Sequence, residues 1–324
     1  GGSGDCLGMI VTPSRSELWS AGEQVCRQFE LGEFRQLEAL PHQGYSNFNA
    51  RLDTDRGTYV LRRYTEQPAE KITHELRLID WLDGQGLPVV PPLRDPNGRA
   101  RCTPNRDHPA PWIVFPFVDG EEPEPLPATA RKMGELAARL HRIPERPWKD
   151  GDRENLLSVR ATLTIADSLR ETGTSSARHF LQVMDLLAPG VHDLNLPTGL
   201  VHGDLFPDNT IFREGNLVAV LDWEEACVDH YLFDLAMAMH GFCYVAEEWR
   251  PDLARSFLAG YEAGRPLDPG ERESLPLFLR WTPLAMAGWH LRRYSLAPSP
   301  RQARRIDQLL RRAETVFDCD PLFP

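Results

Sequence analysis

Hydrophobic and polar positions in the first third of the chain change from the spacing of strands to the spacing of a helix. Residues 46–52 alternate, residues 53–57 carry turn residues, and residues 58–61 are β-rich, which together predict a hairpin. Apolar residues then recur at three- and four-residue intervals across 69–82, which predicts an amphipathic helix closed by the glycines that follow. With a further strand predicted at 112–118, this region is expected to form a small sheet with one helix.

Helical spacing dominates the rest of the chain. The predicted helices cover residues 128–143, 178–187, 253–261 and 301–317, the last being basic and amphipathic. A short β-like island at residues 200–223 lies among them, with a turn at 213–216.

The acidic, proline-rich residues 119–127 are typical of a linker, so we place a boundary between two lobes there. The expected organisation is an N-terminal lobe over residues 9–119 and a helical C-terminal lobe over residues 120–324. Residues 1–8 resemble the remnant of an expression tag, and we exclude them from fold reasoning.

Composition and charge narrow the class of protein. The chain has 324 residues, 41% of them hydrophobic and 26% charged, as in ordinary globular proteins. Its formal net charge of −11 does not favour nucleic-acid binding. No apolar run reaches the roughly 18 to 20 residues that cross a bilayer, and no secretory signal is visible, so we expect a cytoplasmic protein without a membrane partner. The six cysteines are scattered, which indicates neither a zinc site nor a disulfide framework.

Three oxygen-bearing side chains form the densest chemical pattern. Asp204 and Asn209 lie five positions apart in a proline-containing loop, and Asp222 follows 13 residues later at the end of a predicted strand. These hard donors can converge on one site, and Mg²⁺ bound to phosphate prefers such oxygen ligands. The alternative is a plain hairpin with a polar turn. The presence of all three side chains in this order and spacing favours a site for magnesium and phosphate instead.

The run from Val201 to Asn209 resembles the catalytic loop of protein kinases, H-R-D-L-x-x-x-N. It is more similar to the H-G-D-x-x-x-x-N loop of the aminoglycoside phosphotransferase and choline kinase superfamily. The resemblance implies a bilobed, protein-kinase-like α+β fold with a small antiparallel sheet in the N-terminal lobe and a larger helical C-terminal lobe. It implies that residues 9–119 form the nucleotide-binding lobe and that residues 120–324 carry the catalytic loop and the substrate pocket. It also implies ATP, or alternatively GTP, together with Mg²⁺ as cofactors.

The same resemblance assigns roles position by position. Asp204 corresponds to the catalytic aspartate that orients the acceptor hydroxyl and receives its proton. Asn209 and Asp222 correspond to the metal ligands, and His202 and Asp234 to residues that brace the loop.

The N-terminal lobe carries matching positions. Arg62 stands where the kinase strand V-A-I-K has its lysine, and Glu75 on the next helix stands where its ion-pair partner lies. The guanidinium group of arginine is planar and has several N–H donors, whereas the ammonium group of lysine is a compact charge. Arg62 is therefore a departure from the family pattern. The nucleotide-covering loop, residues 40–47, has one glycine, so Ser46, Asn47 and backbone N–H groups are expected to cover the phosphates.

A small-molecule acceptor is favoured over a protein acceptor. Only 11 residues separate Asp222 from Asp234, and they contain neither A-P-E nor a Ser or Thr for an activation segment. Three alternatives stay open: an aminoglycoside-type phosphotransferase, a protein Ser/Thr kinase of the same fold, and a nucleotide-binding scaffold without catalysis. A metallohydrolase would need further histidine ligands near His202, which the sequence lacks.

Residues 196–212 resemble the L-P-x-G-x-x-H-A-D-L-F-x-D-N-x-x-F run of the homoserine kinases that share this fold, with Gly203 in place of alanine. The implied acceptor is an amino alcohol such as homoserine. Candidate acceptor-binding residues are Trp223, Glu224, His240, Tyr244, Trp289 and Arg292. Arg292 suits a carboxylate and Glu224 an ammonium group, while the alternatives are helix packing for Trp289 and a surface position for Arg292.

Overall fold

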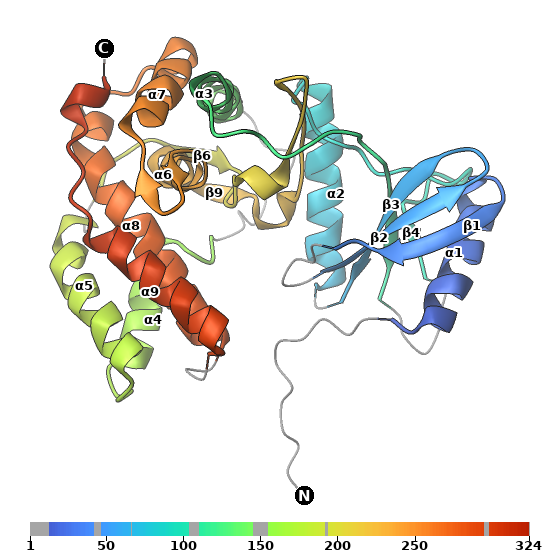
Figure 1. Cartoon of the computed structure of the whole chain (residues 1–324), viewed down its shortest axis with the longest axis horizontal. Helices are drawn as coiled ribbons and strands as arrows, with labels where there is room; N and C mark the ends of the chain where they lie inside the picture. Colours follow the sequence, from blue (N-terminus) through green and yellow to red (C-terminus); the bar gives the residue numbers. More distant parts are fainter. Residues whose placement is uncertain are drawn as a thin grey trace, which may run out of the picture. The chain divides into compact units, whose positions relative to one another are not determined.

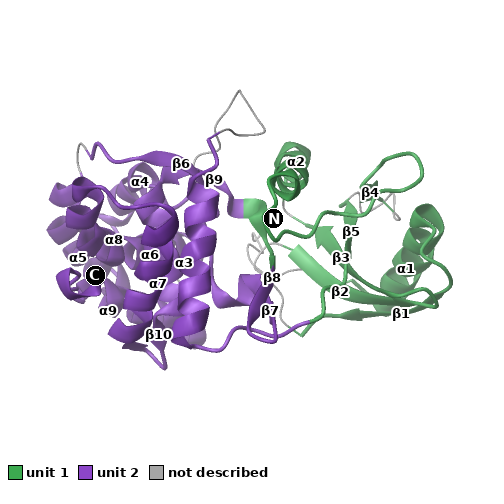
Figure 2. Cartoon of the chain, turned by 90° about the horizontal axis from the view of Figure 1, so that it is seen from above, with its two compact units in different colours: residues 1–119, 219–224 green, residues 120–218, 225–324 purple. Residues whose placement is uncertain are grey.

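The computed structural model describes residues 13–41, 47–65, 67–103, 110–144, 155–191, 194–294 and 298–323. The chain divides into two compact units, residues 1–119 with 219–224 and residues 120–218 with 225–324 (Figure 2). The tag-like residues 1–8, Ser46 and most of the loop expected over the phosphates lie outside the described residues.

The first unit is built on a five-stranded antiparallel sheet in the order β1-β2-β3-β5-β4 (Figure 1). The strands are β1 (Phe34–Ala39), β2 (Asn47–Thr54), β3 (Thr58–Tyr64), β4 (Arg101–Cys102) and β5 (Trp112–Pro116), and the helices are α1 (Arg15–Phe29) and α2 (Ala69–Gly84). The predicted β2–β3 hairpin is confirmed, with Asp53 opposite Thr58 beside the turn. Buried side chains of α1, such as Val25, pack with Leu52 and Leu61 to form the core.

Residues 219–224 belong to the first unit, whereas the sequence pattern placed them in the C-terminal lobe. The reason is a set of long-range contacts that no local pattern reveals. The backbone N–H of Val220 donates to the Pro88 carbonyl over 2.6 Å, and Val89 pairs with Val220 in a parallel bridge.

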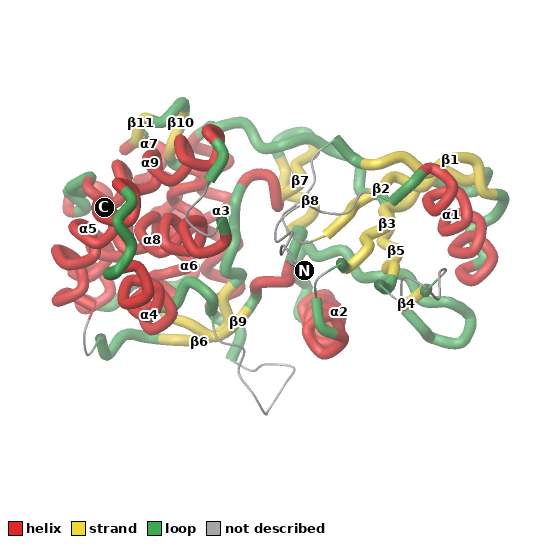
Figure 3. Tube along the Cα trace, turned by 90° about the horizontal axis from the view of Figure 1, so that it is seen from below, coloured by secondary structure: helices red, strands yellow, loops and turns green. Residues whose placement is uncertain are grey.

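Helices form most of the second unit, as expected (Figure 3). They are α3 (Pro127–His141), α4 (Val159–Leu169), α5 (Ser175–Val191), α6 (Tyr231–Phe242), α7 (Pro251–Gly264), α8 (Pro269–Arg293) and α9 (Pro300–Glu314), with the short helices η1 (Pro207–Asn209), η2 (Trp223–Glu225) and η3 (Asp320–Leu322). The short strands are β6 (Thr198–Val201), β7 (Thr210–Arg213), β8 (Asn216–Val220), β9 (Cys227–His230), β10 (Tyr244–Val245) and β11 (Glu248–Trp249). β6 pairs with β9, and β7 with β8 across the predicted turn.

Two features of the second unit position the candidate site. Helix α6 is buried along nearly all of its length, because apolar residues occupy every side of it. Helices α3 and α7 cross closely: a Cβ on Gly134 would lie 2.0 Å from the Phe257 carbonyl oxygen, and one on Gly260 would lie 2.1 Å from that of Arg131. Glycine at both positions lets the two backbones approach and brings buried polar side chains of α3, α6 and α7 together.

In the described part of the chain, five cysteines are buried and none is in a disulfide. A search of the same residues finds no helix with the length and hydropathy of a membrane span.

Candidate active site

Arg62 on β3 is the centre of a charged cluster in the first unit. Its Nη1 atom lies 3.3 Å from Glu75 Oε1 on α2 and 3.2 Å from Asp222 Oδ1, and its Nε donates to Asn49 Oδ1 over 3.1 Å. The Tyr64 hydroxyl donates to Glu75 Oε2 over 2.9 Å. The pairing of Arg62 with Glu75 is therefore present, and Asp222 shares the same cation.

Burial and neighbouring charges have opposite effects on the pKa values of Glu75 and Arg62. Burial raises the pKa of Glu75 to about 7, although the Arg62 guanidinium acts in the opposite direction. Burial alone would lower the pKa of Arg62, but the carboxylates of Asp222, Glu75 and Glu224 raise it above its ordinary value. The Arg62 guanidinium thus contacts the carboxyl groups of Glu75 and Asp222 and also interacts with the charge of Glu224.

Glu224 and Trp223 lie beside this cluster. Glu224 is buried, and its Oε2 accepts hydrogen bonds from Asn47 Nδ2 over 2.9 Å and from Gln67 Nε2 over 3.0 Å. Trp223 is also buried and donates its indole N–H to the Val220 carbonyl over 3.1 Å. These contacts join β2 to residues 219–224 and place both side chains in the first unit.

The backbone at Asp222 adopts a φ of 60°, in the left-handed region that residues other than glycine rarely occupy. Such conformations cost on the order of 1 kcal/mol and cluster at functional sites. Here the unusual φ turns the chain after β8 and presents the Asp222 carboxylate, whose Oδ1 meets Arg62. A carboxylate in this carboxyl-rich cluster fits the donor chemistry of Mg²⁺.

Asp234 on α6 holds the loop that follows β6. Its Oδ2 accepts the backbone N–H of His202 over 3.1 Å, and its Oδ1 accepts that of Gly203 over 2.8 Å. Gly203 has a φ of 82°, and a Cβ there would lie 2.7 Å from the Glu225 carbonyl oxygen, so the loop conformation requires glycine. His202 Nδ1 accepts the N–H of Asp204 over 3.2 Å. The buried carboxylate and imidazole thus fix the backbone that carries Asp204.

Asn209 closes the same loop around η1. Its Nδ2 donates to the backbone carbonyl of Asp204 over 2.8 Å and to Asp204 Oδ2 over 3.0 Å. The second bond fixes the carboxylate of Asp204. Because both bonds use the amide nitrogen, Oδ1 of Asn209 is directed to the other side of the amide, and this hard oxygen fits Mg²⁺. Asn209 belongs to the second unit and Asp222 to the first.

A buried chain of side chains supports Asp234 from behind. Arg265 Nη1 donates to the Tyr261 hydroxyl over 3.0 Å, which donates to His141 Nδ1 over 2.8 Å. His141 Nε2 then donates to Asp234 Oδ2 over 3.0 Å. Burial alone would raise the pKa of Asp234, but the hydrogen bonds from His141 and from the backbone N–H of Gly203 hold it below its usual value.

His141 and Tyr261 were not among the residues expected to act on the loop. Each looks like an ordinary helix residue in the sequence, and His141 falls beside the apolar face that Ala137 and Leu140 define. In the sequence, the signal for this supporting role was a histidine beside the apolar face of a predicted helix. Its partner could not be identified, because Tyr261 is 120 residues away.

The remaining acceptor candidates lie in the second unit. His240 and Tyr244 stack with ring centroids 5.3 Å apart and planes 16° apart. Trp289 is half-buried, and the Arg293 guanidinium lies 5.5 Å from the centre of its ring. Arg292 is exposed at the end of α8.

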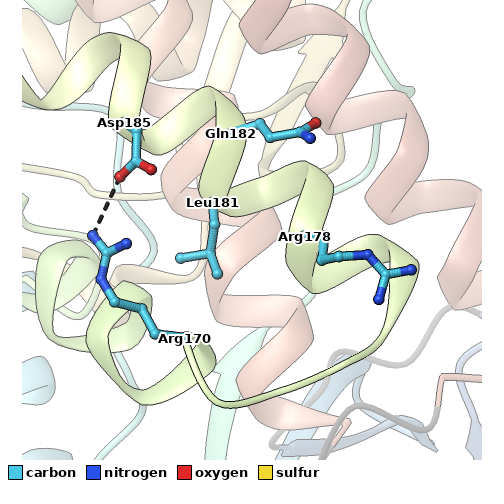
Figure 4. A pocket seen from close by; sticks show the side chains of 5 residues that line it. All are labelled: Arg170, Arg178, Leu181, Gln182 and Asp185. Atoms are coloured by element: carbon cyan, nitrogen blue, oxygen red, sulfur yellow. Dashed lines mark hydrogen bonds and ion pairs between the residues drawn. The ribbon is translucent and has the colours of Figure 1, made fainter.

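Across the described ranges, no three His, Cys, Asp or Glu side chains are grouped in a way that could hold a metal ion. A surface hollow of about 270 Å³ lies over α4 and α5 and is lined by Arg170, Arg178, Leu181, Gln182 and Asp185 (Figure 4). None of the candidate site residues lines it, so this hollow is separate from the candidate active site.

The unit built on a five-stranded antiparallel sheet and the helical unit together have the architecture of the bilobed protein-kinase-like α+β fold. Solved structures share this fold. An amicoumacin kinase in complex with AMP-PNP and Ca²⁺ matches with a TM-score of 0.69 and 17% identity, over 97% of this chain and 96% of that one. A microcompartment-associated aminopropanol kinase matches with a TM-score of 0.71 and 18% identity, over 90% of this chain and 94% of that one.

The model of the Phosphotransferase enzyme family matches residues 38–273, and the chain belongs to that family. A homoserine kinase of Caulobacter vibrioides is 31% identical over 82% of this chain and 85% of its own length. A homoserine kinase of Gluconobacter oxydans is 32% identical over 72% of this chain and 75% of its own length. The protein is an ATP-dependent phosphotransferase that acts on a hydroxyl group of a small metabolite.

Proposed function

We propose that this protein is a homoserine kinase, which transfers the γ-phosphoryl group of Mg-ATP to the homoserine hydroxyl. The observation that carries the proposal is its identity of 31–32% to homoserine kinases over most of both chains. The run of residues 196–212, with its catalytic loop, supports the same acceptor. The expected cytoplasmic location remains a prediction.

Asp204 is the catalytic residue in this proposal. Its carboxylate, held by Asn209 and by the Asp234-braced backbone, orients the acceptor hydroxyl and accepts its proton. The hydroxyl oxygen then bonds to the γ-phosphorus as the bond from that phosphorus to the β–γ bridging oxygen breaks, which releases ADP. The protein forms no covalent bond to the phosphoryl group in this proposal. It lowers the activation barrier mainly by aligning the hydroxyl with the γ-phosphoryl group and by stabilising the charge of the transition state.

Asn209 Oδ1 and the Asp222 carboxylate are the residues that would hold Mg²⁺. Held by these two side chains, Mg²⁺ would supply positive charge that offsets the negative charge of the phosphoryl group. Arg62 contacts the nucleotide phosphates in the role of the kinase lysine, and Glu75 and Asn49 keep its guanidinium oriented. Asn47, the first residue of β2, and Ser46, which precedes it in the sequence, are the side chains that this proposal expects to cover the phosphates.

The acceptor is tested by initial rates with ATP or GTP against homoserine, choline, an aminoglycoside and a casein mixture. The proposal predicts the highest kcat/KM for homoserine, by at least about tenfold, because a site built for a polar group rejects analogues that lack it. A higher kcat/KM for the aminoglycoside or for casein would replace homoserine by that class of acceptor. Nucleotide binding without transfer to any acceptor would indicate a scaffold.

A further inference from the structure

His141 on α3 has a hydrogen-bond partner at each nitrogen of its ring. Its Nε2 lies 3.0 Å from Asp234 Oδ2 on α6, and its Nδ1 lies 2.8 Å from the Tyr261 hydroxyl on α7. All three residues are buried, and their helices lie side by side in the second unit (Figure 1). A neutral imidazole carries its one N–H proton on either nitrogen, so the tautomer of His141 decides whether it can donate to Asp234.

Asp234 requires a donor at Nε2 of His141. Its Oδ1 accepts the backbone N–H of Gly203 over 2.8 Å, and its Oδ2 accepts that of His202 over 3.1 Å. Burial alone would raise the pKa of Asp234, but the hydrogen bonds that it accepts hold the pKa below its usual value, so the side chain is ionised. An ionised carboxylate accepts hydrogen bonds and donates none. The neutral His141 ring therefore carries its proton on Nε2, which leaves Nδ1 as an acceptor.

Tyr261 faces this acceptor with its hydroxyl group, which has one proton. Arg265 Nη1 donates to the hydroxyl oxygen over 3.0 Å, and a guanidinium accepts no hydrogen bond, so the hydroxyl proton does not point toward Arg265. It points toward His141 Nδ1 instead. In the opposite tautomer, the lone pair of Nε2 would face the Asp234 carboxylate, which is repulsive. Asp234 and Tyr261 therefore select the same tautomer from the two sides of the ring.

The contacts of Arg265 hold the guanidinium that orients the hydroxyl. Its Nη2 lies 2.9 Å from Glu271 Oε1, and the exposed fractions of the two side chains are only 14% and 2%. The guanidinium also lies 4.5 Å from the centre of the Tyr231 ring. The His141 ring stacks on that same ring, with centroids 4.7 Å apart and planes 27° apart. Packing thus limits the position of the imidazole, while the hydrogen bonds determine which nitrogen is protonated.

We propose that Tyr261 is a positioning residue for phosphoryl transfer, because its hydroxyl holds His141 in the tautomer that donates to Asp234. The inference rests on the proposed function, in which Asp204 is the catalytic residue. Asp234 accepts the N–H of Gly203, the residue before Asp204, so the orientation of its carboxylate sets the loop backbone. Without the Tyr261 hydroxyl, the buried Nδ1 atom has no donor, and the ring is no longer held in one tautomer and orientation.

The test combines kinetics with ¹⁵N NMR of protein labelled at histidine. Tyr261→Phe removes the hydroxyl and keeps the ring. His141→Gln and His141→Asn are a matched pair, since the amide nitrogen of glutamine can reach the position of Nε2, whereas that of asparagine reaches only the position of Nδ1. The signals that disappear in His141→Gln identify His141 in the wild type. Tyr59→Phe is the control, because Tyr59 is a half-buried tyrosine on β3 in the other unit.

Wild-type His141 is expected to show a protonated Nε2 and an unprotonated Nδ1, and Tyr261→Phe should lose this pattern. Because a shift of about 1 Å in a catalytic group can cost about 10²-fold in rate, we expect Tyr261→Phe to lower kcat with homoserine about tenfold. The KM values should stay within about threefold, since substrate binding does not use this chain of hydrogen bonds. His141→Gln should have a kcat about tenfold above that of His141→Asn, and Tyr59→Phe should match the wild type.

A wild-type kcat in Tyr261→Phe, or a lower kcat with unchanged His141 signals, would overturn the proposal. Equal kcat values for His141→Gln and His141→Asn would also overturn it, and this comparison supplies the test if Tyr261→Phe does not fold. If the wild type does not phosphorylate homoserine, the proposed function fails instead. The NMR result is independent of the acceptor, and a wild-type His141 protonated on Nδ1 alone would overturn the role of Tyr261.

Discussion

At the scale of single residues, polar contacts between side chains hold the candidate site in place. Arg62 meets Glu75 and Asp222, Asp234 accepts two loop N–H groups, and Asn209 bonds Asp204. These positions were predictable because phosphoryl transfer requires particular residue types in a fixed order. Supporting residues such as His141 are not constrained in that way, and their partners are set by tertiary packing.

The Arg62 cluster gives a prediction about stability and pH. Arg62→Gln leaves Glu75 buried without its cation, which should cost about 2 to 4 kcal/mol of unfolding free energy at pH 7. The pKa of Glu75 is raised in the folded state, so protonation of Glu75 favours the folded state. The stability of the variant should therefore be highest at low pH and fall as pH rises from about 4.5 through 7.

Urea unfolding at pH 5.5 and pH 7.5 measures this effect. The double variant Arg62→Gln, Glu75→Gln removes the uncompensated carboxyl group and should lose less stability at pH 7.5 than Arg62→Gln alone. The account would be contradicted if Arg62→Gln lost the same unfolding free energy at both pH values. It would also be contradicted if the losses of the two single variants simply added up in the double variant.

At the scale of elements, the predicted helices and the β2–β3 hairpin are present. The ends differ by a few residues: α5 and α7 are longer than predicted, whereas α3 and α9 end earlier, at His141 and Glu314. Helix α1 was missed although Ser14 and Glu17 form a capping box at its start. Helix α6 was missed because it is apolar on all sides and shows no amphipathic spacing. Helix α8 was missed because it contains Pro276 and Pro283, and proline usually indicates the end of a helix. At Pro283 the carbonyl that loses its helix donor is satisfied by His240, a partner that local sequence does not reveal.

The α3–α7 crossing gives a prediction at this scale. Gly134→Ala places a methyl group against the Phe257 carbonyl, which α3 and α7 can relieve only by moving apart. We expect a loss of about 1 to 3 kcal/mol and a lower kcat, because the same crossing holds His141 and Tyr261 behind Asp234. Thermal melting and initial rates test this. Gly173→Ala, where a Cβ meets nothing within 4 Å, is the control and should leave both unchanged.

At the scale of the whole molecule, a boundary between two lobes after residue 119 is a prediction from the sequence, and the compact units of the structure are residues 1–119 with 219–224 and residues 120–218 with 225–324. The assignment of residues 219–224 to the first unit was not expected. The contacts of Val220 with Pro88, of Asp222 with Arg62 and of Glu224 with Asn47 connect segments more than 100 residues apart. A reading of local periodicity cannot find such pairings, so the location of Asp222 in the first unit is information that only the structure supplies.

The central claim is that this phosphotransferase uses Asp204 to activate its acceptor hydroxyl. Its most direct test is kcat of Asp204→Asn with homoserine, alongside calorimetric affinity for Mg-AMP-PNP. The variant keeps the size of the side chain, so nucleotide affinity should stay within about threefold of the wild type. Loss of a positioned base should lower kcat by about 10²- to 10⁴-fold. A folded variant that binds nucleotide normally and retains most of its turnover would contradict the account.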